Sequence, residues 1–145
     1  SMKPKQFIDQ LDDDAVVAAI KDAEAKTSGE IRVFVSHRNV ADPLAAAQKH
    51  FLRLKMDRTH DRNAVLIFVA PKSHQFAIIG DAAVHAKCGE AFWSQAAAAM
   101  SDHFKRSAWS EGIIHVIRKV GDLLAQHFPR RSGDVNQLSD QVERD

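Results

Sequence analysis

The chain has 145 residues, enough for one compact domain with its own core, and its 45% hydrophobic and 27% charged residues are close to ordinary globular usage. Its 20 basic and 19 acidic side chains leave a formal charge of +1, which argues against an electrostatic nucleic-acid binder. The single cysteine, Cys88, excludes an internal disulfide, and no apolar run approaches the roughly 20 residues that span a bilayer, so we expect a cytoplasmic protein with no transmembrane segment.

The first half of the chain predicts a helix, a strand and a second helix. Aspartates 12–14 supply an N-cap and an acidic first turn for a helix that stops at Thr27. Residues 30–36 predict a strand, because Ile31, Val33 and Val35 fall at alternate positions. Pro43 then suits the first turn of a helix that carries apolar side chains at helical spacing.

The second half predicts a hairpin followed by two long helices. The continuous apolar run 64–70 is typical of a central strand that is covered on both faces. Residues 71–74 are short enough for a hairpin connection, and residues 75–79 form the returning strand. A helix over residues 90–104 and another that begins near Ser110 complete the domain.

This order of elements predicts an α/β fold, a three-layer α/β/α sandwich with a small mixed sheet. The first two strands are joined through a helix and should be parallel, whereas the third returns through a short connection and should be antiparallel. We place the domain at residues 1–128. Residues 129–145 are polar, and we expect them to form a mobile, loosely attached C-terminal tail.

Several segments follow one another in an order and spacing that point to a known family. They are residues 23–24, 27–33, 63–70 and 76–81, then His85, Gly89, residues 92–93, 103–104 and 111–114. Together they resemble the TPM-domain family, which includes thylakoid-lumen photosystem repair proteins and many bacterial proteins. The resemblance covers about residues 15–128.

The resemblance implies an α/β/α sandwich and, from plant members, an acid phosphatase whose site can hold a divalent cation such as calcium. Many bacterial members carry a signal peptide and a membrane anchor, and this chain shows neither segment. It also has Ala64 after Asn63, where many relatives have glycine.

The strand directions predict where a site would lie. One edge of the sheet receives the starts of the first two strands and the end of the third, which brings together Asp61, Arg62, Asn63 and Asp81, with His85 about one turn further on. Hard cations prefer carboxylate oxygens, so we expect Asp61 and Asp81 to hold Ca²⁺ or Mg²⁺.

We assign phosphoester binding at this edge to Arg62 and Asn63, because a guanidinium clamps phosphate through its planar fork. Asp81 and His85 are the expected catalytic residues, with His85 as proton donor to the leaving group. The predicted reaction is cation-assisted phosphoester hydrolysis through an activated water.

Each of these residues also has an ordinary structural interpretation. Asp61 and Asn63 are common loop residues that bond to nearby backbone, Asp81 can cap the next helix, and His85 can be a surface histidine. The alternative function is therefore a non-catalytic binding or accessory module that meets a protein partner during assembly or repair of membrane complexes.

Overall fold

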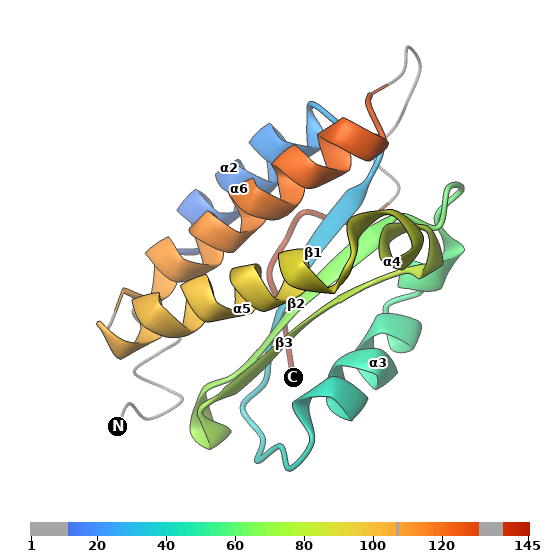
Figure 1. The fold of residues 1–145 in the computed structure, drawn as a ribbon. Helices are drawn as coiled ribbons and strands as arrows, with labels where there is room; N and C mark the ends of the chain where they lie inside the picture. Colours follow the sequence, from blue (N-terminus) through green and yellow to red (C-terminus); the bar gives the residue numbers. More distant parts are fainter. Residues whose placement is uncertain (1–11, 107, 131–137) are drawn as a thin grey trace.

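A sheet with helices on both faces forms the centre of the molecule (Figure 1). The structure is a computed structural model that describes residues 12–106, 108–130 and 138–145. Its described strands run in the order β3-β2-β1-β4, with the bounds Glu30–Val35 for β1, Ala64–Ala70 for β2, Gln75–Gly80 for β3 and Glu143–Arg144 for β4. β1 and β2 are parallel and β3 runs antiparallel to β2, which confirms the predicted directions.

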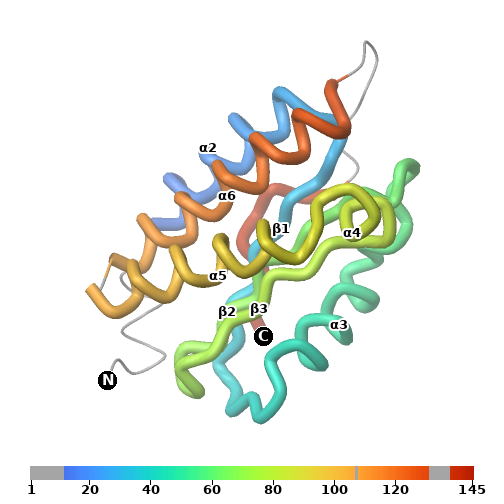
Figure 2. Tube along the Cα trace, in the orientation of Figure 1, coloured from blue at the N-terminus to red at the C-terminus, as the bar shows by residue number. Residues whose placement is uncertain are grey.

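The helices form the two outer layers. Their bounds are Asp13–Glu24 for α2, Pro43–Arg53 for α3, Ala82–Cys88 for α4, Glu90–Lys105 for α5 and Trp109–His127 for α6, with short 3₁₀ turns at Met56–Arg58 (η1) and Pro71–Ser73 (η2). Figure 2 shows α2, α5 and α6 on one side of the sheet and α3 on the other. This arrangement confirms the α/β/α sandwich. None of the described helices combines the length and apolar composition needed to cross a membrane.

Two of the predicted helix starts are confirmed by capping hydrogen bonds. The backbone N–H of Ala15 donates to Asp12 Oδ1 over 3.0 Å at the start of α2. The N–H of Ala45 donates to Asp42 Oδ1 over 3.1 Å at the start of α3, where Pro43 occupies the first turn. Such caps satisfy backbone donors that a helix leaves open, and each stabilises the helix by about 1 kcal/mol.

The apolar side chains of β2 belong to two hydrophobic cores, one on each face of the sheet. Val65, Ile67 and Val69 pack with α2 and α6 on one face. Leu66 and Phe68 point to the opposite face and pack with Phe51 of α3 and its neighbours. Successive side chains of a strand alternate between the faces, so a strand buried on both faces has no polar position. This accounts for the continuous pattern in the sequence.

The pair α2 and α6 packs closely at one glycine. A Cβ added to Gly121 would lie 2.6 Å from Ala23 Cβ, closer than real Cβ atoms approach. The two helices therefore meet with small residues at their crossing, which lets their axes approach.

Of the tail that we expected to be mobile and loosely attached, residues 129–145, residues 131–137 lie outside the described residues, and the described end of the chain is joined to the sheet. Glu143 and Arg144 form β4, which pairs with Phe34 and Val35 at the end of β1. Glu143 also forms an ion pair with the buried Arg32, and Asp145 Oδ1 accepts the His37 N–H over 2.7 Å. Residues 143–145 are attached to the sheet by polar contacts and backbone pairing, and neither kind of contact can be recognised from a hydrophobicity pattern. The domain boundary at residue 128 stays a prediction.

Candidate functional site

The predicted edge of the sheet forms as the strand directions require. Glu30 of β1 lies opposite Ala64 of β2, and Val65 lies opposite Gly80 of β3. The starts of β1 and β2 and the end of β3 therefore meet at one edge. The loop before β2 and the turn before α4 bring the candidate side chains to it.

An ion pair between Arg62 and Asp81 dominates this edge. Arg62 Nε donates to Asp81 Oδ2 over 2.7 Å and Nη2 donates to Oδ1 over 2.8 Å, the bidentate geometry that suits a guanidinium and a carboxylate. The hydrogen bond and the charge of Asp81 raise the pKa of Arg62 above its usual value. Asp81 is 6% exposed, whereas the side chain of Arg62 is 53% exposed. The buried Asp81 carboxylate thus holds in place the Arg62 guanidinium, which faces solvent.

Asp81 also has the structural role that the sequence offered as an alternative. Its Oδ1 accepts the N–H of Ala82 over 2.8 Å, and Asp81 is the N-cap of α4. The backbone N–H of Asp81 donates to Ala64 O over 2.9 Å, and the N–H of Ala83 donates to Arg62 O over 3.2 Å. These bonds tie the turn before α4 to the loop before β2, so the orientation of Arg62 is fixed by both segments.

A second hydrogen-bonded group surrounds Asp61. Asn63 Nδ2 donates to Ser28 Oγ over 3.2 Å, Ser28 Oγ donates to Asp61 Oδ2 over 3.5 Å, and His60 Nδ1 lies 2.9 Å from Asp61 Oδ1. Asn63 is fully buried, and its Oδ1 has no hydrogen-bond partner among the described residues. This group connects the start of β1 with the loop before β2.

An open groove of about 680 Å³, which we call the Arg62 groove, runs between α3, β3 and the start of α5. Its polar end contains Arg62, Asp81 and His85, with Asp57 and Glu90 nearby. Its apolar walls are Leu44, Phe51, Leu52, Ile78, Ile79 and Trp93. Leu44 and Leu52 are 52% and 62% exposed, so the wall from α3 is open to solvent.

The donors at this edge fit a divalent cation only in part. Asp81 uses both carboxylate oxygens for Arg62 and the α4 cap, and the guanidinium places a positive charge beside it. Asp61, with the Ser28 hydroxyl and the buried Asn63 Oδ1 in the same group, supplies oxygens of the kind that hard cations prefer. In the described part of the chain, no three His, Cys, Asp or Glu side chains form a metal-binding group.

The structure thus divides the predicted site residues into two sets. Arg62, Asp81 and His85 line the same groove, whereas Asp61 and Asn63 belong to the group beside Ser28. The sequence analysis assigned no role to Ser28 or to His60, although His60 stands directly before Asp61.

Trp93 packs against the core and also lines the groove, 6.0 Å from the His85 ring between ring centroids.

Burial raises the pKa of the Cys88 thiol, which disfavours the reactive thiolate.

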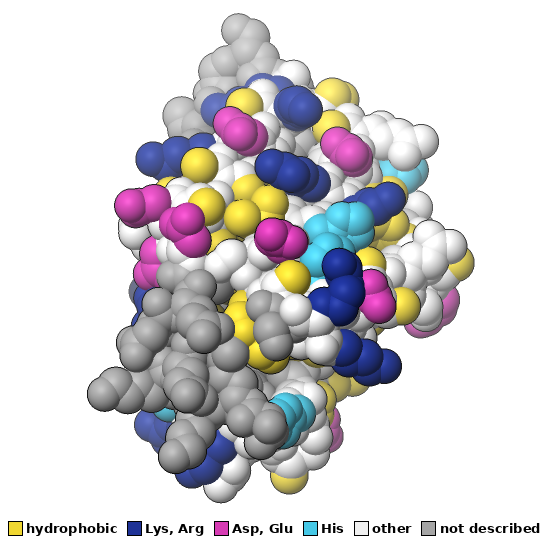
Figure 3. Space-filling model, turned by 90° about the vertical axis from the view of Figure 1, so that its left-hand side faces the viewer, with side chains coloured by type: hydrophobic (Ala, Val, Ile, Leu, Met, Phe, Trp, Pro, Cys, Tyr) yellow, Lys and Arg dark blue, Asp and Glu magenta, His cyan; other side chains and the backbone are white. Residues whose placement is uncertain are grey.

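Charge is distributed evenly on the part of the surface that Figure 3 shows. Figure 3 views the molecule from the left-hand side of Figure 1, where α5 ends and α6 begins. Basic, acidic and hydrophobic side chains are interspersed there. The described side chains visible in this view therefore form no concentrated basic patch of the kind that guides nucleic acid to a protein.

Comparisons with known proteins give one family and one fold. The family model of the TPM domain matches residues 1–123. The NMR structure of BA42 from the psychrophilic bacterium Bizionia argentinensis superposes with a TM-score of 0.85 at 35% identity, covering 92% of each chain. The N-terminal domain of cg2496 from Corynebacterium glutamicum gives a TM-score of 0.60 at 20% identity, covering 86% of this chain and 77% of that one. A comparison with curated proteins finds no significant match.

Proposed function

This chain belongs to the TPM-domain family, and on that premise we propose that it hydrolyses phosphomonoesters in the Arg62 groove. The observation that carries the proposal is the solvent-facing guanidinium of Arg62, held by a buried carboxylate in the same groove as His85. The family model bears the name of a phosphatase, which agrees with this chemistry. A cytoplasmic location stays a prediction.

In this proposal Arg62 binds the phosphoryl group. A guanidinium has five N–H donors, and Asp81 accepts only two of them, from Nε and Nη2. The remaining donors face away from Asp81 and can bind two phosphate oxygens. Asp81 acts as a positioning residue, because its two hydrogen bonds hold the plane of the guanidinium in one orientation. Preorganised donors of this kind stabilise the charge that develops on a transferring phosphoryl group.

His85 is the proposed proton donor. It lines the same groove as Arg62, and the proposal requires that the leaving-group oxygen of a phosphoester bound to Arg62 lies next to it. As a water molecule forms a new bond to phosphorus, the bond from phosphorus to the leaving oxygen breaks, and that oxygen takes a proton from His85. One hydrogen of the water stays on the new phosphate hydroxyl, the other passes to solvent, and His85 regains a proton from solvent. The products are an alcohol and inorganic phosphate.

A divalent cation, Ca²⁺ or Mg²⁺, is part of the proposal, with Asp61 and Asp81 as its predicted carboxylate ligands. The Asp61 side is favoured, because both carboxylate oxygens of Asp81 already bond to Arg62 and the buried Asn63 Oδ1 near Asp61 has no hydrogen-bond partner among the described residues. Such a cation would neutralise phosphate charge and activate a water molecule. Asn63, which is buried, would contribute through the Ser28–Asp61 group and not by direct contact in the groove.

The apolar walls of the groove indicate which esters should react best. Leu44 and Leu52 from α3, Ile78 of β3 and Trp93 of α5 all line the groove. An aromatic or aliphatic leaving group can lie on this wall while the phosphate stays at Arg62. Aryl phosphates should therefore be better substrates than glycerol phosphate.

The test is phosphate release from p-nitrophenyl phosphate by the purified protein, with Ca²⁺, with Mg²⁺ and with a chelator. We expect turnover that a cation increases, and Arg62→Gln should lower kcat/KM by about 100-fold. Arg58→Gln is the matched control, because Arg58 is an exposed arginine close in sequence that does not line the groove.

Two further variants separate the roles of the residues. His85→Asn should lower kcat by about 100-fold with little change in KM. Asp81→Asn keeps an oxygen for the α4 cap but loses the charge that orients Arg62, so KM should rise. Absence of turnover with every cation, in a protein whose fold is intact, would refute the phosphatase and leave the accessory role. Turnover that survives Arg62→Gln would refute the site.

A further inference from the structure

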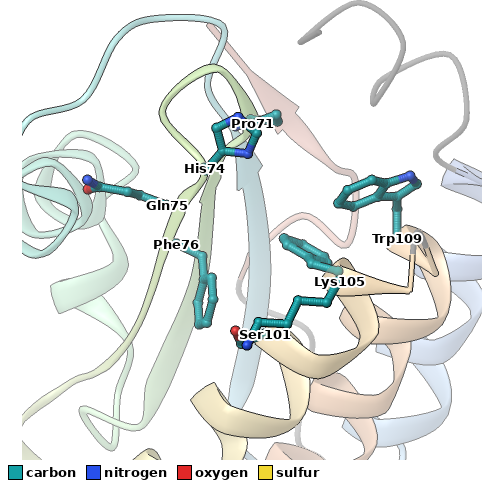
Figure 4. A pocket seen from close by; sticks show the side chains of 8 residues that line it. Pro71, His74, Gln75, Phe76, Ser101, Lys105 and Trp109 are labelled. Carbon is teal, nitrogen blue, oxygen red and sulfur yellow. The ribbon is translucent and has the colours of Figure 1, made fainter. Parts of the chain in front are cut away.

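A second cavity lies at the opposite edge of the sheet from the Arg62 groove. It has a volume of about 260 Å³ and is enclosed by the η2 turn, the start of β3, the end of α5 and the start of α6 (Figure 4). Its lining residues are Pro71, His74, Gln75, Phe76, Ser101, Phe104, Lys105 and Trp109. None of them lines the Arg62 groove. We call it the aromatic pocket.

Three aromatic rings give this pocket its shape. The Phe76 and Phe104 rings are 6.0 Å apart between centroids at an interplanar angle of 75°, an edge-to-face pair. The Phe104 and Trp109 rings are 5.0 Å apart at 58°. All three rings are only partly buried, although they pack against the core. Rings arranged in this way accept the face or edge of one more flat ring, because aromatic groups prefer such tilted geometries.

The polar groups of the pocket come mainly from one helix. Ser101 and Lys105 are four residues apart on α5, so they lie on the same side of the helix. Figure 4 shows the Lys105 side chain extending along the pocket toward Ser101, below Phe76, whereas the Gln75 side chain points away. An ammonium and a hydroxyl therefore stand together at one side of an aromatic cavity.

No acidic side chain among the described lining residues neutralises the positive charge of Lys105. Neither aspartate nor glutamate is among the lining residues. The nearest acidic side chain in sequence, Asp102, pairs with Arg106 at 3.3 Å, and among the described residues nothing forms an ion pair with Lys105. His74, at the far side of the pocket, adds no negative charge. The polar side of the pocket, formed by Lys105 and Ser101, therefore favours an anion and disfavours a cation.

We propose that the aromatic pocket binds a small aromatic carboxylate, with its ring among Phe76, Phe104 and Trp109 and its carboxylate on Lys105 and Ser101. One ammonium and one hydroxyl match a singly charged carboxylate. A phosphate dianion is usually held by more donors or by an arginine fork, and the pocket has no arginine. The volume is below the range of drug-sized ligands, which limits the ligand to one or two rings.

The test is a titration of the ¹⁵N-labelled protein with indole-3-acetate, followed by NMR. We expect saturable shifts at residues 71–76 and 101–105 and at Trp109, with a Kd on the order of 0.1–1 mM for a ligand of this size. Indole-3-acetamide has the same ring without the charge and should bind about fivefold more weakly. Tryptamine, which carries a positive charge, should bind more weakly still. Inorganic phosphate alone should leave these signals unchanged.

Variants distinguish the pocket from nonspecific binding. Lys105→Gln should weaken indole-3-acetate about fivefold and leave indole-3-acetamide unchanged, whereas Lys105→Arg should restore the affinity. Lys49→Gln, an exposed lysine of α3, is the control and should change nothing. Ser101→Leu should block binding by filling the cavity, and a thermal melt shows whether that variant is folded.

Three results would overturn the proposal: no saturable shift for indole-3-acetate, equal affinity for the acetate and the acetamide, or shifts that lie around Arg62. Because phosphate release is measured separately, loss of the phosphatase proposal would leave this one intact.

Discussion

The buried carboxyl group of Glu24 should make the stability of this protein fall as the pH rises, and Glu24→Gln should remove that dependence. Glu24 ends α2, is 6% exposed and accepts the Ile31 N–H on Oε2 over 2.7 Å. Its carboxyl group lies against those of Glu30 and Asp140. Burial, followed by the hydrogen bond with Asp140, raises the pKa of Glu24 to about 11. The group therefore stays protonated in the folded protein at neutral pH.

The sign and size of the effect follow from proton linkage. Below the ordinary pKa of 4.5, both the folded and the unfolded states carry the proton, and the group adds no pH dependence. Above it the unfolded state releases the proton while the folded state keeps it, so the free energy of unfolding falls by about 1.4 kcal/mol per pH unit. At pH 7 this reaches about 3 kcal/mol, an upper limit because Glu30 and Asp140 share the proton.

Glutamine cannot ionise but keeps an oxygen for the Ile31 N–H. Glu24→Gln should therefore match the wild type near pH 4.5 and exceed its stability by about 1–3 kcal/mol at pH 7–8. The measurement is urea unfolding followed by circular dichroism at several pH values. Asp22→Asn, an exposed aspartate of the same helix, is the control and should keep the wild-type slope. Parallel curves for wild type and Glu24→Gln would show that Glu24 is ionised in the folded state.

Three further substitutions test the packing and the attachment of β4. Gly121→Ala should destabilise the protein by about 1–3 kcal/mol, because the new Cβ would meet Ala23 at 2.6 Å; a thermal melt measures it, and an unchanged Tm would contradict the close helix contact. Phe68→Ala should cost about 3–5 kcal/mol in urea unfolding, since the ring is fully buried, and a loss below 1 kcal/mol would mean that the core refills. Glu143→Gln leaves the buried Arg32 without its ion pair, so hydrogen exchange at β4 should accelerate and stability should fall by about 1–2 kcal/mol, whereas the exposed control Glu111→Gln should change neither.

Part of the candidate site could be predicted from the sequence. Strand directions placed Arg62, Asp81 and His85 at one edge of the sheet, and the structure brings all three into one groove. The same reasoning treated Asp61 and Asp81 as a pair of cation ligands. The structure pairs Asp81 with Arg62, which lies two residues before the start of β2 and whose guanidinium reaches the cap of α4 directly. Cation binding by Asp61 and Asp81 stays a prediction. Topology predicts which residues are neighbours, but side-chain geometry decides which of them form bonds.

The sequence alone determined the long helices, the first three strands with their directions, and the family. These depend on local signals: the alternating apolar residues of β1, the unbroken apolar run of β2, the aspartate cap of α2, Pro43 in the first turn of α3, and a hairpin connection too short for a parallel return. Each of these signals lies within a few consecutive residues, so it can be interpreted without knowing where the rest of the chain lies.

Only the tertiary structure decided the attachment of β4, the Arg62–Asp81 pair and the two cavities. Glu143 meets Arg32 across 111 positions of sequence, and Phe76 and Trp109 line one pocket formed by a strand and two helices. Contacts of this kind depend on distances between distant segments and on the rotamers of polar side chains. Neither leaves a periodic pattern in the sequence, because a surface polar residue looks the same whether or not it has a partner.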